Sequence, residues 1–246
     1  MDASVSVGAG AGVGVLGAGL AALRRSWRPF VLIQLVAVAL VVAYHASPGV
    51  RAWCEALAAW KTAGGLPLAA ATAAFAGGVL PELAKAVALR GRAPRRGRAG
   101  EVAFNVAFFA FNGVVVDFLY RGEARLFGLG TGATTVAAKV AFDQLVFTPP
   151  WLCLITALYL FRARGFSWAA TRPAFTRGFL RARVLPLLLP DWLFWIPMVS
   201  VVYAFPLPLQ FLLFILALAA WSLILVVIAG GEASDGPAAG QGRLEA

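Results

Sequence analysis

The feature that most constrains this chain is an apolar run from Thr134 to Phe161 that carries a lysine, an aspartate and a Pro-Pro step. At about 1.5 Å per helical residue, such a run crosses a hydrocarbon core of roughly 30 Å. Several other apolar runs approach the same length, and only 13% of the 246 residues are charged. Ordinary soluble domains carry about 25% charged residues. The sequence therefore predicts an all-α, polytopic integral membrane protein built as a helical bundle.

Polar residues share one side of this run. Lys139 and Asp143 are four residues apart, so a helix places them on the same face, and Gln144 begins a second polar row beside them. A charged group near the bilayer centre costs roughly 2.5–3.5 kcal/mol, so it needs a partner or water. Lys139 and Asp143 can be that partner for each other. We expect this face to line either a bundle core or a water-filled path.

The Pro-Pro step interrupts the same helix. Pro149 and Pro150 have no backbone N–H and crowd the carbonyl groups four residues earlier, at Leu145 and Val146. These carbonyl groups then need other donors, which neighbouring helices, hydroxyl groups or water supply inside a membrane. We expect a break in the helix at this point.

The remaining apolar runs divide the chain into four parts. We expect further spans over 30–46, 66–89, 102–120 and 208–229, and a short interfacial helix over 50–61. Residues 184–205 form either a broken half-span or a segment packed under the bundle. The expected parts are a Gly/Ala-rich N-terminal segment (1–29), an extra membrane span with the interfacial helix (30–65), a four-helix membrane domain (66–229) and a flexible polar tail (230–246). The first part is a cleaved transit segment, a Gly-rich tail or a close-packing small-residue helix.

The chain has a net charge of +10, and most of its basic residues lie in the loops between the expected spans. The stretches 24–28, 90–98 and 162–183 contain 14 Lys and Arg residues, against 5 in the alternate loops and the tail. This asymmetry predicts that the N-terminus lies on the positive side and that four crossings follow up to Phe161. Because the basic residues do not form one patch, nucleic-acid binding is not expected. The loops favour a bacterial inner membrane, with an organellar membrane as the alternative.

Another expected span also carries polar side chains. Asn105 and Asn112 are seven residues apart on one helix face, and Asp117 lies near the end of the same span. The candidate polar core is therefore Lys139, Asp143, Gln144, Asn105, Asn112 and Asp117. These residues either line a path for water and ions or connect helices by hydrogen bonds, which contribute about 0.6 kcal/mol each on average in membranes.

The sequence offers few residues for catalysis or metal binding. Cys54 and Cys153 have no CxxC spacing, and His45 is the only histidine. No serine-hydrolase or zinc-protease motif occurs. We therefore expect no cofactor, no metal site and no enzymatic activity. No convincing internal repeat supports a secondary transporter.

Motifs within 66–229 resemble the family of the 22-kDa peroxisomal membrane protein and its mitochondrial inner-membrane relative, the Mpv-seventeen protein. The most specific is the order Lys139, Asp143-Gln144 and Pro149, which is similar to the family's Lys…Asp-Gln…Pro helix. Gly113 and Tyr120 fit a second family step, although Val114, Asp117 and Leu119 replace its proline, histidine and tryptophan. The last helices resemble the family at Trp192, Trp195, Pro197 and Trp221.

The resemblance implies a compact four-helix membrane unit, no cofactor, and pore activity for small solutes. We therefore expect a small-solute pore or channel-like protein, with a non-conducting membrane scaffold or homeostasis protein as the alternative. The expected partners are membrane lipids and small-molecule or ion solutes, and assembly as a homo-oligomer is left open.

Overall fold

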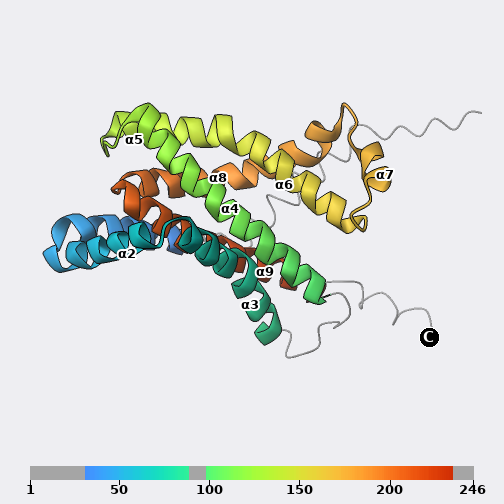
Figure 1. Ribbon diagram of the computed structural model, residues 1–246, viewed down its shortest axis with the longest axis horizontal. Helices are drawn as coiled ribbons and strands as arrows, with labels where there is room; N and C mark the ends of the chain where they lie inside the picture. Colours follow the sequence, from blue (N-terminus) through green and yellow to red (C-terminus); the bar gives the residue numbers. More distant parts are fainter. Residues whose placement is uncertain (1–30, 89–97, 235–246) are drawn as a thin grey trace, which may run out of the picture. The chain divides into compact units, whose positions relative to one another are not determined.

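The computed structural model of the chain describes residues 31–88 and 98–234 (Figure 1). Every regular element in these ranges is helical, so the expected all-α class is confirmed. A helix over Val31–Ala46 comes first. The labelled helices are α2 (Pro48–Ala73), α3 (Leu80–Ala88), α4 (Arg98–Phe127), α5 (Ala133–Ala141), α6 (Thr148–Ala163), α7 (Trp168–Thr171), α8 (Leu185–Tyr203) and α9 (Leu207–Ser234). The expectations for segment 1–29, for the loop over 90–98 and for the polar tail lie wholly or mainly outside the described residues.

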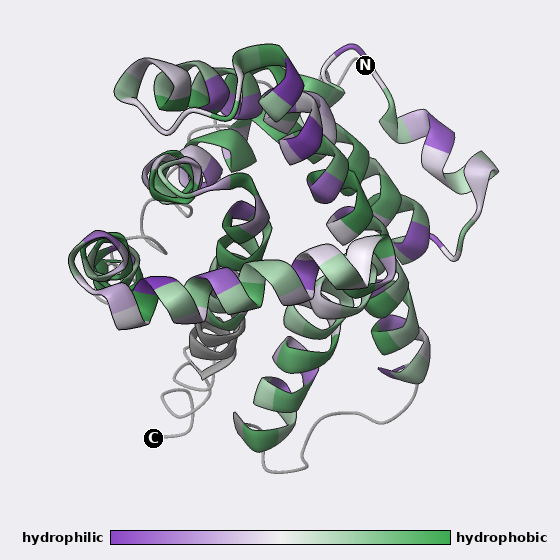
Figure 2. Cartoon of the chain, turned by 60° about the vertical axis from the view of Figure 1, so that its left-hand side comes forward, coloured by the Kyte–Doolittle hydropathy of each residue, from purple (hydrophilic) through white to green (hydrophobic). Residues whose placement is uncertain are grey.

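Four stretches are long and apolar enough to cross a membrane. They are Pro48–Val87, Arg98–Phe127, Ala133–Ala163 and Leu180–Tyr203. Figure 2 shows hydrophobic residues along most of each helix, with hydrophilic residues interspersed. Residues 184–203, expected as either a broken half-span or a segment packed under the bundle, belong to one continuous helix that is long and apolar enough to cross a membrane. The chain is thus an integral membrane protein of the helical class.

The helices belong to two compact units. Gly130–Ala204 form unit 1. In this unit α5 packs against α8, and α6 packs against both α8 and the turn Leu180–Val184 that precedes α8. The stretch Ala133–Ala163 therefore runs antiparallel to Leu180–Tyr203 as a helical hairpin. The other described residues form unit 2, in which α2 packs against α4 and α9, and α3 packs against α9.

Prolines widen three helices into π turns. The turns are η1 (Ala74–Val79), η2 (Phe142–Phe147) and η4 (Leu180–Val184). Each ends two residues before a proline, at Pro81, Pro149 and Pro186 respectively. A proline ring clashes with the carbonyl group four residues earlier, and a wider turn relieves this clash without ending the helix. The break expected at Pro149 is therefore a π turn within a continuous helix.

Glycine residues set the close packing of unit 2. A Cβ atom on Gly78 would lie 2.8 Å from the Cα atom of Val106 on α4, so only glycine permits this approach. The Gly77-Gly78 pair is thus a point of close contact with α4. Gly65 has a φ angle of 53° and separates α2 into two helical segments. It lies between the expected interfacial helix over 50–61 and the expected span over 66–89.

Candidate functional site

The main polar cluster lies in unit 1, within the middle of an apolar helix. Lys139 is 1% exposed, Asp143 is 6% exposed and Gln144 is 3% exposed. Lys139 lies at the end of α5, and the other two residues lie in the π turn η2. The expected burial of these three side chains is therefore observed. We call Lys139, Asp143, Gln144 and Tyr203, which joins them from α8, the polar core of unit 1.

Tyr203 organises this polar core. Its hydroxyl group donates a hydrogen bond of 2.8 Å to Oδ2 of Asp143, and the tyrosine is fully buried. The Thr148 hydroxyl group lies 3.5 Å from Oδ1 of the same carboxylate. The Nζ atom of Lys139 lies 5.9 Å from the centre of the Tyr203 ring, within the range of a cation–π interaction. A cation, a carboxylate and a phenol thus share one buried site.

The π turn also changes the backbone hydrogen bonds next to the carboxylate. The N–H group of Thr148 donates to the carbonyl of Asp143, five residues earlier, instead of the carbonyl of Gln144. The indole Nε1 of Trp192 donates a hydrogen bond of 2.9 Å to the freed Gln144 carbonyl. The side-chain oxygen of Gln144 is buried and has no hydrogen-bond partner among the described residues. A buried acceptor of this kind is suited to a water molecule or a polar solute.

A second carboxylate lies near the polar core. Asp191 on α8 interacts electrostatically with Asp143. Two acidic groups and one lysine inside an apolar hairpin form an unusual concentration of charge, because ionisable groups in membrane spans are costly and rare. Neither Asp191 nor Tyr203 was predicted as a neighbour of Asp143. Asp191 and Tyr203 are dozens of residues away from Asp143 in the sequence, so no local spacing pattern indicates that they lie close to it.

Unit 2 contains a separate group of buried charges. Lys61 on α2 forms an ion pair with Asp117 on α4, and the Nε atom of Arg121 lies 2.7 Å from Oδ2 of the same aspartate. Lys61 is only 5% exposed, although its place at the end of the expected interfacial helix over 50–61 predicts an exposed side chain. The difference arises because α2 continues helically past Lys61 and packs its inner face on α4. The ammonium group of Lys61 also lies 4.7 Å from the centre of the Phe211 ring on α9.

The other expected polar-core residues lie on α4. Asn112 is buried and Asn105 is half-buried, so the two asparagines differ in exposure although they share a helix face. The structure therefore places the six candidate residues in two groups, with Lys139, Asp143 and Gln144 in unit 1 and the remaining three in unit 2. Glu123, also on α4, is fully buried and was not among the predicted polar-core residues.

The family-motif residues have mainly packing roles. Gly113 lies against the α2 backbone at Ala69 and against the Cβ atom of Ala73. Tyr120 is 3% exposed, and its ring is edge-on to Phe214 of α9 at 6.2 Å. The other positions lie on helices as follows: Pro149 at the start of α6, Trp192, Trp195 and Pro197 on α8, and Trp221 on α9.

Metal ligands do not cluster in the part of the chain that the structure describes. Within those residues no group of three or more His, Cys, Asp or Glu side chains could hold a metal ion. Cys54 and Cys153 are both free thiols.

Comparisons with protein-family models, with curated proteins and with solved structures give no match to this chain.

Proposed function

We propose that this membrane protein lets small polar solutes or ions cross the bilayer, and that the polar core of unit 1 is the selective part of the path. One observation carries the proposal: Lys139, Asp143 and Gln144 are buried in the middle of an apolar helix long enough to span a membrane. Charges in this position are costly unless they serve a path for polar species or are fully satisfied by partners. The unsatisfied side-chain oxygen of Gln144 favours the first explanation.

The chemistry of the polar core fits selection by charge. The Asp143 carboxylate attracts cations, while the Lys139 ammonium group attracts anions and repels cations. The Tyr203 hydroxyl group and the Gln144 amide offer neutral hydrogen bonds to a passing solute. Replacing either charge should therefore change which solutes cross, in opposite directions, without removing the helices that form the path.

A flux assay tests this proposal. The purified chain is reconstituted into liposomes, and uptake of small cationic, neutral and anionic solutes is followed after rapid mixing. Asp143→Asn should slow cation uptake relative to anion uptake, and Lys139→Gln should have the opposite effect. Lys85→Gln is the matched control, because Lys85 pairs with Glu82 at a half-exposed site outside the polar core. Equal uptake by liposomes with and without the protein would reject the proposal.

A non-conducting scaffold is the second candidate, and a specific observation favours it. Asp143 already accepts hydrogen bonds from the hydroxyl groups of Tyr203 and Thr148, so its burial is partly satisfied by the protein itself. The ion pair between Lys61 and Asp117 likewise joins two helices. A scaffold of this kind would lose stability after Asp143→Asn and would show no protein-dependent solute uptake in either form.

We further propose that the chain is a diverged member of the family of the 22-kDa peroxisomal membrane protein. The support is that two separate motifs meet in unit 1: the Trp192 indole donates to the Gln144 carbonyl. Both residues belong to positions where the chain resembles the family. The proposal expects the same tryptophan-to-carbonyl hydrogen bond in an experimental structure of a family member, and its absence there would argue against common descent. The bacterial inner membrane remains the proposed location.

A further inference from the structure

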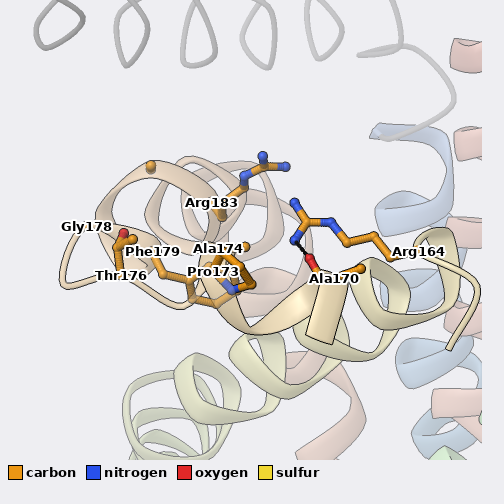
Figure 3. Close-up of a pocket in the computed structure, with 9 residues that line it drawn as sticks. Arg164, Ala170, Pro173, Ala174, Thr176, Gly178, Phe179 and Arg183 are labelled. Carbon is orange, nitrogen blue, oxygen red and sulfur yellow. Dashed lines mark hydrogen bonds between the residues drawn. The ribbon is translucent and has the colours of Figure 1, made fainter. Parts of the chain in front are cut away.

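The connection between the two long helices of unit 1 contains a cavity of about 460 Å³ (Figure 3). The connection starts where α6 ends and continues through α7 and the short 3-10 turn η3 (Arg172–Ala174) to η4. Residues that line the cavity are Arg164, Ala170, Pro173, Ala174, Thr176, Gly178, Phe179, Ala182 and Arg183. Two arginine side chains from different elements therefore border one cavity, whose lining is both polar and apolar.

This part of the chain is strongly basic. Six arginines occur between residues 162 and 183, and no aspartate or glutamate occurs from 144 to 190. Arg164 is held in place, since its Nη1 atom donates hydrogen bonds of 2.6 Å to the carbonyl of Ala170 and 3.3 Å to that of Thr171. Arg183 is exposed at the cavity. An anchored guanidinium group and an adjustable one are suited to grip a phosphate group.

The place of the connection between two candidate spans implies that the cavity lies at the level of the bilayer surface. The helices before and after the connection, Ala133–Ala163 and Leu180–Tyr203, are both long and apolar enough to span a membrane. The link between two such spans must emerge where the hydrocarbon core ends. The distribution of arginines assigns this end to the positive side of the membrane, where anionic lipids attract basic segments in many membranes.

Exposed aromatic side chains border the same connection. Trp168 is 62% exposed, and its ring lies 5.7 Å from that of Phe175, which in turn lies 5.0 Å from that of Phe179. Tryptophan and other aromatic rings are enriched at the boundary between lipid head groups and hydrocarbon. Next to them, Leu180 and Leu185 at the start of the second span are 54% and 53% exposed and offer an apolar surface to acyl chains.

We propose that this cavity binds the head group of an anionic phospholipid, with the lipid phosphate held between Arg164 and Arg183. The acyl chains lie along the exposed leucines at the start of the second span. The interfacial position favours a lipid over a free phosphate ion, because a lipid brings both the phosphate and the apolar chains that this surface accommodates. The site is independent of solute passage through the polar core.

Native mass spectrometry of the full chain in neutral detergent micelles tests the proposal. The probe is phosphatidylglycerol, titrated until half of the protein carries one lipid, and phosphatidylcholine is the uncharged comparison. Arg183→Gln should weaken phosphatidylglycerol binding about tenfold, as expected for loss of one charge-assisted hydrogen bond. Because Arg183 is exposed, this change leaves the packing intact. Arg177→Gln is the matched control, since it removes an exposed arginine of the same connection that does not line the cavity.

We expect the affinity of Arg177→Gln for phosphatidylglycerol to lie within twofold of the wild-type affinity. Phosphatidylcholine should bind more weakly than phosphatidylglycerol, and neither substitution should change its affinity. Three results would overturn the proposal. Equal losses for Arg177→Gln and Arg183→Gln would show diffuse attraction to the basic surface, and equal binding of the two lipids would show no recognition of the head group. Displacement of phosphatidylglycerol by inorganic phosphate at similar concentration would identify a site for the free ion.

Discussion

Replacing Gly113 by alanine tests the packing of α4 on α2. A Cβ atom at this position would overlap the carbonyl oxygen of Ala69 and lie 2.5 Å from the Cβ atom of Ala73. Non-bonded carbon atoms in contact are about 3.5–4.0 Å apart, so the two helices would have to separate by more than about 1 Å. Overpacking of this kind typically costs about 1–3 kcal/mol. We expect the upper half of that range, because one of the two obstacles is backbone.

A second glycine on the same helix supplies the control. A Cβ atom on Gly122 would meet nothing within 4 Å. Both substitutions gain the same preference of alanine for helix, about 1 kcal/mol. The difference between Gly113→Ala and Gly122→Ala therefore isolates the contact, and we expect Gly113→Ala to be the less stable by about 2–3 kcal/mol.

The assay is equilibrium unfolding in mixed micelles, with increasing dodecyl sulfate and with tryptophan fluorescence and helical circular dichroism as independent signals. Both signals should give the same midpoint if one transition is observed. Equal free energies of unfolding for the two variants would refute the close contact between α2 and α4. A Gly113→Ala variant that is more stable than Gly122→Ala would refute the contact as well.

Three further predictions concern the buried charges, the polar core and the topology. Lys61→Met should lower the free energy of unfolding, measured in the same micelles, by about 3 kcal/mol. This is the lower end for breaking a buried ion pair, because Arg121 still faces Asp117. If the double variant with Asp117→Asn loses the sum of the two single losses, the two residues do not form a pair. Tyr203→Phe should cost about 1–3 kcal/mol, because it removes a hydroxyl donor from the buried Asp143 carboxylate, and an unchanged unfolding midpoint would show that this hydrogen bond is absent. In a variant without Cys54 and Cys153, new cysteines at Ala169 and Gly128 should react with impermeant maleimide from opposite sides of the membrane, since Ala133–Ala163 crosses between them; labelling from one side only would contradict that crossing.

Local physical rules made the helices and their irregular turns predictable. Apolar runs predicted where long apolar helices lie, although the span expected over 30–46 is a shorter helix, Val31–Ala46, and Leu180–Tyr203 is long enough to be a candidate span. The steric effect of proline identified positions such as Pro149 where an ordinary α-helix could not continue. The geometry of the helix at each proline was less predictable, because a proline can end a helix, kink it or widen one turn into a π turn. The choice of a π turn depends on tertiary partners, such as Trp192, that satisfy the displaced carbonyl group.

Contacts between distant residues account for what the sequence could not supply. The four-residue spacing of Lys139 and Asp143 predicted a shared helix face, and both residues are buried. Nothing in the spacing identified Tyr203, which is 60 residues from Asp143, as a hydrogen-bond donor. Lys61 shows the same limit: the sequence places it at the end of the expected interfacial helix over 50–61, and only its packing on α4 reveals its partner Asp117.

The most direct test of the proposed function is the reversal potential across a planar bilayer that contains the purified protein, with a salt gradient between the two sides. Conductance steps should appear with the protein and not in protein-free controls. Asp143→Asn should shift the reversal potential toward anion selectivity, and Lys139→Gln should shift it toward cation selectivity. Folded protein that gives no conductance at any voltage, or steps whose reversal potential neither substitution changes, would contradict a path through the polar core.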